Sequence, residues 1–376
     1  MSTTVWLAAR TIDHLDLGGH FWFHLNWALG LRALGCDVVW LEPVGPDVPA
    51  DDVQTRVAVL KSLLRSYGLA DRVSLCSWTD KSLAPAATVD CVAPEEATDA
   101  DMLLNMAYGI PSQVVERFRR SALLDVDPGL TQFWISRRFI RIARHTTYFS
   151  IGETVAQAET QVSDCGIAWH YTPPCVALEW WPAQRTTASA PFTTVSNWEM
   201  NEWMEGPTGW YRNDKRTAFL PYVDLPHRVT QPLELALFLG GHDDERVALE
   251  QKGWRVREAH EVVATPDQYQ SYITNSGGEF SCAKPSYVHL QTAWISDRTL
   301  CYLASGKPAV VQHTGPSRFL PDAHGLFRFR NVDEAAGYLE MAHVDYSKHC
   351  AASRALAEEY FDARKVVGRV LERTLA

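Results

Sequence analysis

The sequence predicts an α/β protein made of two Rossmann-like domains, and three observations carry this prediction. The chain has 376 residues, whereas single domains usually have about 100–200. Short apolar runs alternate with segments of helical periodicity, which is typical of parallel strands joined by helices. At about 171–191, a stretch rich in Pro, Thr and Ser interrupts this alternation and predicts a linker.

A strand–helix–strand unit opens the first predicted domain. Residues 5–9 form an apolar run, residues 21–34 have the apolar spacing of a helix, and Gly35 ends that helix. Residues 38–41 form the next apolar run, so these two strands are expected to pair in parallel. Further helices are predicted at 51–69, 112–120 and 133–143, and further strands at 102–105, 122–127 and 145–151.

A second alternation of predicted strands and helices begins near residue 192. The segment 233–239 is compatible with a helix or a strand. We predict an N-terminal domain over 1–180, a second domain over 190–348, and a last helical segment over 349–376. The other elements predicted in this half are strands at 254–256 and 309–312, a loop leading into a strand at 277–280, and helices at 266–274, 296–305, 332–339 and 347–375.

The composition is that of a globular protein, and we expect it to be cytoplasmic. Hydrophobic residues make up 46% of the chain and charged residues 21%, which excludes extensive disorder. The apolar runs are shorter than the roughly 18–20 residues of a membrane span, and the N-terminus lacks the pattern of a signal peptide. The eight cysteines form no CxxC pair, so reduced thiols are expected.

The net charge of −10 argues against nucleic acid as a partner of the whole chain, because nucleic-acid-binding surfaces are basic. Two local groups of arginines leave that possibility open, although solvated helix faces are the simpler interpretation. The 14 tryptophans favour core anchors, and some of them could stack on sugar rings. The arginine groups are Arg117, Arg119 and Arg120, and Arg137, Arg138, Arg141 and Arg144.

Gly18-Gly19-His20 precede the first predicted helix. Paired glycines let the backbone approach a ligand, and the unpaired N–H groups of a helix start favour phosphate. His20 could act as a base, because the helix N-terminus should lower its pKa and keep it neutral near pH 7. The alternative is a packing turn with His20 as a cap. The sequence contains neither a GxGxxG motif nor a Walker lysine here.

A second candidate phosphate site lies at Ser296-Asp297-Arg298-Thr299. Ser296 or Asp297 is expected to cap a helix, which places Arg298 and Thr299 in its first turn. An arginine there opposes the helix dipole, so an anionic diphosphate explains it better than helix stability does. The alternative is a salt bridge from Arg298 to Asp297 or to another neighbour.

The helix that follows Ser296 runs into Leu-Ala-Ser-Gly-Lys-Pro-Ala-Val-Val. This order of elements resembles the nucleotide-sugar-binding unit of glycosyltransferases with the GT-B fold. The glycine loop at 18–20 and the helix ending in Gly35-Cys36-Asp37-Val38 resemble the N-terminal part of the same family. The resemblance implies two Rossmann-like domains facing each other across a cleft. It also implies that the helix at 349–375 crosses back to the N-terminal domain.

The resemblance further implies sugar transfer from a nucleotide-diphosphate sugar to a hydroxyl-bearing acceptor, with no metal or other cofactor. Retaining members carry a glutamate for the donor ribose where this chain has Cys301, so Glu279 or Asp297 would have to replace it. His20 is the predicted base, with Asp127 as the second candidate. The predicted donor-binding residues are Gly18, Gly19, Glu279, Ser281, Lys284, Ser296, Asp297, Arg298, Thr299, Thr314 and Gly315, and the predicted acceptor-binding residues are Trp22, Trp134 and Glu153.

Asp125-Val126-Asp127 follows an apolar strand and has three open interpretations. It could bind a metal, as Asp-x-Asp does in the other large glycosyltransferase fold, supply a catalytic or acceptor-binding carboxylate, or form a turn with Pro128-Gly129. We predict no metal ligand. Glu153 and the pair at 314–315 also follow strands, and the carboxyl ends of strands face the crevice of open α/β sheets.

Two other functions stay open at this point. They are a nucleotide-sugar epimerase on the same fold and a non-catalytic, two-lobed binding protein. Aromatic residues of the first half, including Trp22, Trp27 and Trp134, favour an enzyme with an acceptor pocket. A nucleotide sugar is the expected partner, and the acceptor could be a natural product, a polysaccharide, a protein or modified DNA. The sequence does not determine the oligomeric state.

Overall fold

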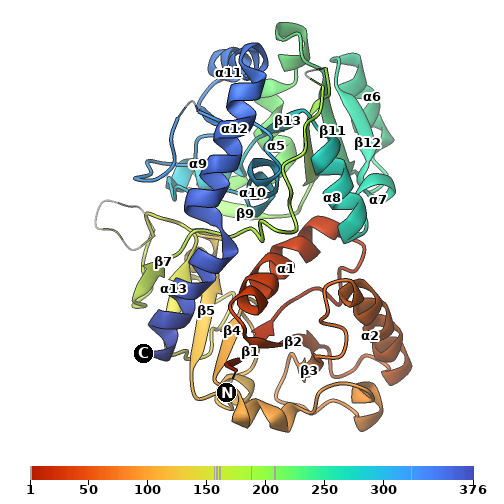
Figure 1. Cartoon of the computed structure of the whole chain (residues 1–376), viewed down its shortest axis with the longest axis vertical. Coiled ribbons are helices and arrows are strands. Elements are labelled where there is room, and N and C mark those ends of the chain that lie inside the picture. The colour runs from red at the N-terminus through yellow and green to blue at the C-terminus, as the bar shows by residue number, and fades with distance from the viewer. Residues whose placement is uncertain are drawn as a thin grey trace. The chain divides into compact units, whose positions relative to one another are not determined.

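The computed structural model forms two compact units and describes residues 2–155, 157, 160, 162–187, 189–206, 209–322 and 324–376. The first unit consists of Met1–Ala177 together with Ala363–Ala376, and the second of Leu178–Asp362. The chain thus first passes from one unit to the other within the Pro-rich stretch at 171–191 (Figure 1).

The first unit is built on a seven-stranded parallel sheet with the order β3-β2-β1-β4-β5-β6-β7. The order reverses between β1 and β4, as in the Rossmann fold. Ligands of such sheets bind beyond the carboxyl ends of the strands that flank this reversal. The strands are β1 Thr4–Ala8, β2 Asp37–Val44, β3 Val73–Ser77, β4 Met102–Asn105, β5 Ser121–Asp125, β6 Thr147–Ser150 and β7 Trp169–Tyr171.

Helices α1 and α13 pack against each other in this unit, although they come from opposite ends of the chain (Figure 1). A side chain at Gly30 of α1 would lie 2.9 Å from Ala363 Cβ and from Val367 Cγ2 of α13, so the close crossing requires glycine. The last 14 residues, 363–376, therefore belong to the N-terminal unit, whereas residues 349–362 of the predicted C-terminal helical segment belong to the second unit. The helices of this unit are α1 Gly18–Ala33, α2 Ala50–Arg65, α3 Ser112–Val115, α4 Leu130–Ser136 and α13 Ala363–Leu375, with 3-10 turns at Pro85–Thr88 and Pro94–Asp99.

The second unit repeats the same topology with six parallel strands in the order β12-β11-β8-β13-β14-β15. The reversal lies between β8 and β13. The segment at 233–239, which the sequence left open, forms a strand, β11. The strands are β8 Phe192–Asn197, β11 Leu233–Phe238, β12 Arg255–Glu258, β13 Gly278–Ser281, β14 Ala309–Gln312 and β15 Leu326–Phe329.

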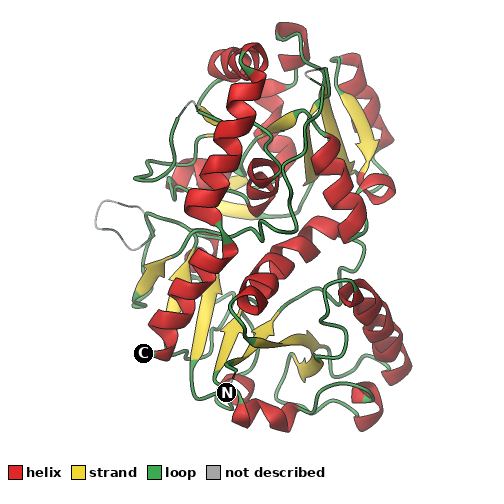
Figure 2. Cartoon of the chain, viewed as in Figure 1, coloured by secondary structure: helices red, strands yellow, loops and turns green. Residues whose placement is uncertain are grey.

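Helices pack around the sheet of the second unit (Figure 2). Local capping explains where two of them begin. Thr265 and Gln268 form a capping box at the start of α8, and the Ser296 side chain accepts a hydrogen bond from Arg298 N at the start of α10. The helices are α5 Lys215–Phe219, α6 Asp243–Gln251, α7 Ala259–Val262, α8 Pro266–Asn275, α9 Pro285–Leu290, α10 Asp297–Ala304, α11 Val332–Val344 and α12 Tyr346–Leu356, with 3-10 turns at Leu220–Tyr222 and Leu225–Arg228.

Several predicted helices are shorter than expected, and the one predicted at 112–120 already ends at Val115 as α3. The helix predicted at 133–143 ends at Ser136, because Arg138 adopts a left-handed backbone conformation with φ 59°. The helix predicted at 347–375 is α12, a π-helical turn at Ala357–Phe361, and then α13. It is interrupted at Asp362, whose ψ of 119° is not helical.

Each sheet packs on an apolar core, and aromatic rings dominate that of the second unit. Phe280 of β13 stacks on Phe329 of β15 with ring centroids 5.4 Å apart, and Phe219 of α5 meets Phe280 edge to face. None of the helices in the described part of the chain has the length and apolar character needed to cross a bilayer.

Candidate functional site

His20 lies in the first turn of α1, where the loop from β1 enters the helix. Its Nε2 atom is 2.6 Å from the carbonyl oxygen of Arg10. A carbonyl oxygen only accepts hydrogen bonds, so Nε2 carries the proton in the neutral ring and Nδ1 carries the lone pair. Helix α1 begins at Gly18 without a side-chain cap, so Gly18, Gly19 and His20 form its first turn and not a loop before the helix as predicted.

Three histidine rings stack edge to face at this end of α1. The ring of His20 lies 5.4 Å from that of His14 and 5.0 Å from that of His24. The pKa of His20 is lowered to about 4, mainly by burial and to a smaller extent by His14 and Arg10, whereas the Arg10 carbonyl and Asp127 oppose the shift. His20 is therefore neutral at pH 7. Burial has a larger effect than the helix N-terminus that the sequence suggested.

Asp125 and Asp127 have different environments, although only one residue separates them. Asp125 is fully buried, and its Oδ2 atom accepts hydrogen bonds from Gln132 Nε2 at 2.9 Å and Ser150 Oγ at 2.7 Å. Burial raises the pKa of Asp125. Asp127 is only partly buried, and its backbone N–H donates to the Tyr108 hydroxyl at 3.1 Å. Asp125 thus organises the loop, and Asp127 is the carboxylate that can reach a ligand.

The loop after β6 packs closely on the loop that carries Asp127. A side chain at Gly152 would lie 2.4 Å from Pro128 Cβ, so glycine is required where the two loops meet. Glu153 follows directly and is 3% exposed. The predicted sites at 125–127 and 152–153 therefore come together at one edge of the first sheet.

The predicted acceptor-binding tryptophans have different locations. Trp134 is partly exposed on α4. Trp22 has no exposed surface and packs edge to face on Tyr67 at 5.6 Å. Complete burial in the core is incompatible with the predicted contact between Trp22 and an acceptor. Helix α1 is buried on nearly all sides, since every residue from His24 to Leu31 is buried, and this places Trp22 in the core as well.

In the second unit, the Arg298 side chain binds to strands β8 and β13 of the sheet. Its Nε lies 2.9 Å from Glu279 Oε1, and its NH1 donates to the Val195 carbonyl oxygen at 2.8 Å. The Glu279 side chain has no exposed surface, and that of Arg298 is 12% exposed. The salt bridge that the sequence left as an alternative is present, but its partner is Glu279 on β13 and not Asp297.

The other predicted donor-binding residues of this unit are also mostly buried. Burial raises the pKa of Asp297 to about 6, and the neighbouring Arg298 opposes this shift. Thr314 donates to the Trp294 carbonyl oxygen at 2.5 Å. A side chain at Gly315 would lie 2.4 Å from the Gln291 carbonyl oxygen. Ser281, Ser296, Thr299 and Thr314 are 5%, 7%, 1% and 3% exposed.

Two lysines place further positive charge beside Arg298. Lys284, at the N-cap of α9, pairs with Glu202 at 2.7 Å. Lys215, the first residue of α5, donates to the Cys282 carbonyl oxygen. The pKa of Lys215 is lowered to about 7, mainly by burial and then by the charges of Arg298 and Lys284. The three cations lie where β8 and β13 end, at the strand-order reversal of the second sheet.

The sequence did not reveal Lys215, because a hairpin separates it from β8. Strands β9 Trp203–Gly206 and β10 Gly209–Arg212 pair antiparallel in this loop. Met204 anchors the hairpin and is 2% exposed, whereas Trp203 and Trp210 are 49% and 55% exposed. An Asp-Lys pair after a loop is a possible helix start, and Asp214 indeed caps α5 by accepting from Thr217 N.

No family model and no curated protein matches this sequence. Solved structures do match it over nearly the whole chain. The HepE protein of Anabaena in complex with UDP and glucose aligns with 99% of both chains at a TM-score of 0.55 and 11% identity. A glycosyltransferase from Rickettsia africae aligns over 99% of this chain and 98% of its own chain, at a TM-score of 0.57 and 9% identity.

An alpha-glucosyltransferase in complex with UDP-glucose and DNA containing an abasic site aligns with 100% of both chains, at a TM-score of 0.56 and 10% identity. The chain has the GT-B fold. The predicted fold class is thereby confirmed, since this fold consists of two Rossmann-like domains. At such low identity, the likeness defines the GT-B fold and assigns no role to any single residue.

Proposed function

We propose that the chain is a glycosyltransferase that moves a sugar from a nucleotide-diphosphate sugar to a hydroxyl-bearing acceptor. One observation carries this proposal. Lys215, Lys284 and Arg298 converge at the strand-order reversal of the second sheet, where α/β proteins bind their ligands. Only part of this charge is neutralised, by Glu279 and Glu202. Two of the solved structures of this fold named above, HepE and the alpha-glucosyltransferase, contain UDP or UDP-glucose, which agrees with a diphosphate at such a site.

The three cations would stabilise the leaving group. In the reaction, an acceptor oxygen forms a bond to the anomeric carbon while the bond from that carbon to the diphosphate oxygen breaks. Negative charge develops on the diphosphate, and fixed cations lower the energy of that transition state. We propose that Lys215 and Lys284 contact the diphosphate. Arg298 contributes its charge from its position between Glu279 and the backbone.

The acceptor proton needs a base, and we propose His20 for this role. The lone pair of its neutral ring is on Nδ1, because Nε2 donates to Arg10. Asp127 lies near enough to affect the pKa of His20 and is the second candidate. We propose that no divalent metal takes part, since the cations supply the positive charge.

Calorimetry with UDP tests the donor site directly. We expect Lys215→Ala to weaken UDP binding by about 1.5–3 kcal/mol, the usual contribution of a hydrogen bond to a charged group. Lys348→Ala serves as the matched control, because Lys348 is an exposed lysine of the same unit. Equal affinity of wild type and Lys215→Ala would exclude the site.

Incubation with a panel of nucleotide sugars then tests the reaction class. Slow release of free sugar and nucleoside diphosphate supports a transferase. An epimerised donor would indicate an epimerase instead. Binding without any turnover, in the presence of a broad acceptor panel, would indicate a binding protein.

A further inference from the structure

The first unit carries an arginine strip, which we define as Arg119, Arg120, Arg138, Arg141 and Arg144. Among the described residues, none of these five guanidinium groups has an ion-pair or hydrogen-bond partner. Ten arginines elsewhere in the described chain are instead paired with a carboxylate. Those paired arginines are Arg56, Arg72, Arg212, Arg216, Arg228, Arg246, Arg298, Arg328, Arg330 and Arg354.

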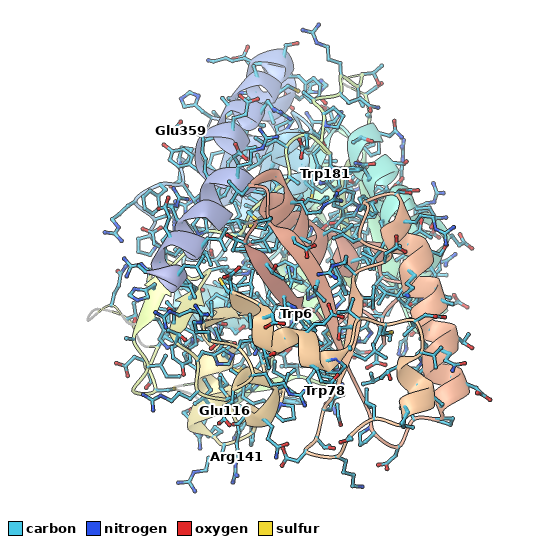
Figure 3. The ribbon with its side chains drawn as sticks, turned by 60° about the horizontal axis from the view of Figure 1, so that its bottom comes forward. Trp6, Trp78, Glu116, Arg141, Trp181 and Glu359 are labelled. Atoms are coloured by element: carbon cyan, nitrogen blue, oxygen red, sulfur yellow. The ribbon has the colours of Figure 1, made fainter. Side chains whose placement is uncertain are left out.

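The two segments of the strip lie side by side. Thr146 N donates to the Ser121 carbonyl oxygen at 2.9 Å; Thr146 is two residues after Arg144, and Ser121 directly follows Arg120. Ala143 also belongs to the same apolar cluster as Val115 and Phe118. Figure 3 shows Glu116 and Arg141 together at one end of the first unit. The two arginine-bearing segments thus meet where β5 and β6 begin, in a protein with a net charge of −10.

Apolar side chains accompany the arginines. Phe139 is 63% exposed, and its ring is held edge to face against Phe133 at a centroid distance of 6.0 Å. Arg138, directly before it, has the left-handed φ of 59° that ends the helix and starts this loop. Ile135, Ile140 and Ile142 are partly exposed in the same segment.

We propose that the arginine strip binds the surface of an anionic lipid bilayer. Guanidinium groups form bidentate hydrogen bonds with phosphate, so lipid headgroups would satisfy the unpaired arginines. Phe139 would enter the boundary between headgroups and acyl chains. Stable attachment to a membrane needs two such signals, and this segment supplies both a basic group and an apolar group.

Nucleic acid offers the same phosphate chemistry but fits the apolar side chains less well. Single strands bind through aromatic faces on which bases stack, and isoleucine offers no such face. Three partly exposed isoleucines beside a single exposed phenylalanine match hydrocarbon better. The proposal does not depend on the sugar transfer proposed above, because the strip includes none of the residues assigned to it.

Co-sedimentation with vesicles tests the proposal. The full chain should bind vesicles of phosphatidylcholine with 30% phosphatidylglycerol and should not bind phosphatidylcholine alone. Binding should weaken as salt is raised, because added ions screen exposed charges. The variant Arg138→Gln/Arg141→Gln/Arg144→Gln should bind at least tenfold more weakly, and Phe139→Ser several-fold more weakly. Thermal melts followed by circular dichroism confirm that both variants fold.

A control variant separates the strip from net charge. Arg228→Gln/Arg246→Gln/Arg330→Gln removes the same charge from paired arginines of the second unit and should bind vesicles like the wild type. Failure of the wild type to bind anionic vesicles would overturn the proposal, as would equal loss in the control. Fluorescence anisotropy with a single-stranded oligonucleotide completes the test. Strip-dependent binding of the oligonucleotide, without vesicle binding, would show that the surface serves nucleic acid instead.

Discussion

The carboxyl edges of the two sheets have opposite chemistry, although the strand order is the same. At the edge of the first sheet, His20 and His24 have lowered pKa values, and His20 lies near Asp127. At the edge of the second sheet lie Lys215, Lys284 and Arg298. One topology thus provides two ligand-binding edges, and the loops after the strands decide the charge of each. The first edge suits proton transfer, and the second suits an anion.

The largest effect is expected at the first edge. His20→Ala should lower turnover about 10²–10⁴-fold, the usual contribution of general-base catalysis, while UDP affinity changes little. Steady-state kinetics and calorimetry on the same preparations measure both quantities. If turnover stays within a few-fold of wild type, His20 is a cap and Asp127 becomes the preferred base. If affinity falls as steeply as turnover, the two edges are not functionally distinct.

The pH profile of kcat/KM offers a second test of the first edge. The pKa of about 4 means that His20 can accept a proton throughout the neutral range. Activity that depends on it should therefore be lost only as pH falls through about 4. A base with an unshifted pKa would instead give a profile that falls between about pH 7 and 6. That outcome would contradict the burial effect on His20.

Arg298 should matter for stability more than an exposed arginine does. Arg298→Ala leaves the buried Glu279 carboxylate without its partner, and breaking such a buried pair costs about 3–5 kcal/mol of unfolding free energy. Arg228→Ala removes an exposed pair with Asp333 in the same unit and should cost about 0–1 kcal/mol. Urea denaturation measures both variants. Similar midpoints would mean that the Arg298–Glu279 pair adds little to the fold, and a direct diphosphate role for Arg298 would then be favoured.

Protonation of Lys215 should produce a smaller effect on donor affinity. With a pKa of about 7, the amine is charged below pH 7 and increasingly neutral above it. UDP binding should therefore weaken as pH rises from 6 to 8.5 and should take up a proton near pH 8. Calorimetry in buffers of different ionisation enthalpy measures that uptake. Lys215→Arg keeps its charge and should abolish the pH dependence; persistence of the dependence would assign it to another group.

The sequence predicts much of the fold and less of the site, for a physical reason. Local periodicity locates strands such as 102–105 and 309–312, since each strand is a short buried run. Pairing between distant residues leaves no local trace. Arg298 meets Glu279 from 19 positions away, and Lys215 reaches the site only because a hairpin precedes it. Both features depend on tertiary contacts, which no window of sequence contains.

The smallest expected effect is that of a chelator. Removing divalent metals should leave turnover unchanged, because the positive charge at the second edge belongs to the protein. At the first edge, the Oδ2 atom of Asp125 already accepts hydrogen bonds from Gln132 and Ser150, so metal coordination through this oxygen would disturb both hydrogen bonds. The assay compares turnover in excess EDTA, without EDTA, and after addition of Mn²⁺ or Mg²⁺. Loss of turnover in EDTA that manganese reverses would make Asp127 a metal ligand, and the two edges would then not have the separate roles proposed here.

The same assay on Lys215→Ala sharpens this result. If added Mg²⁺ raises the turnover of Lys215→Ala but not that of the wild type, a metal ion can replace the missing charge of the lysine.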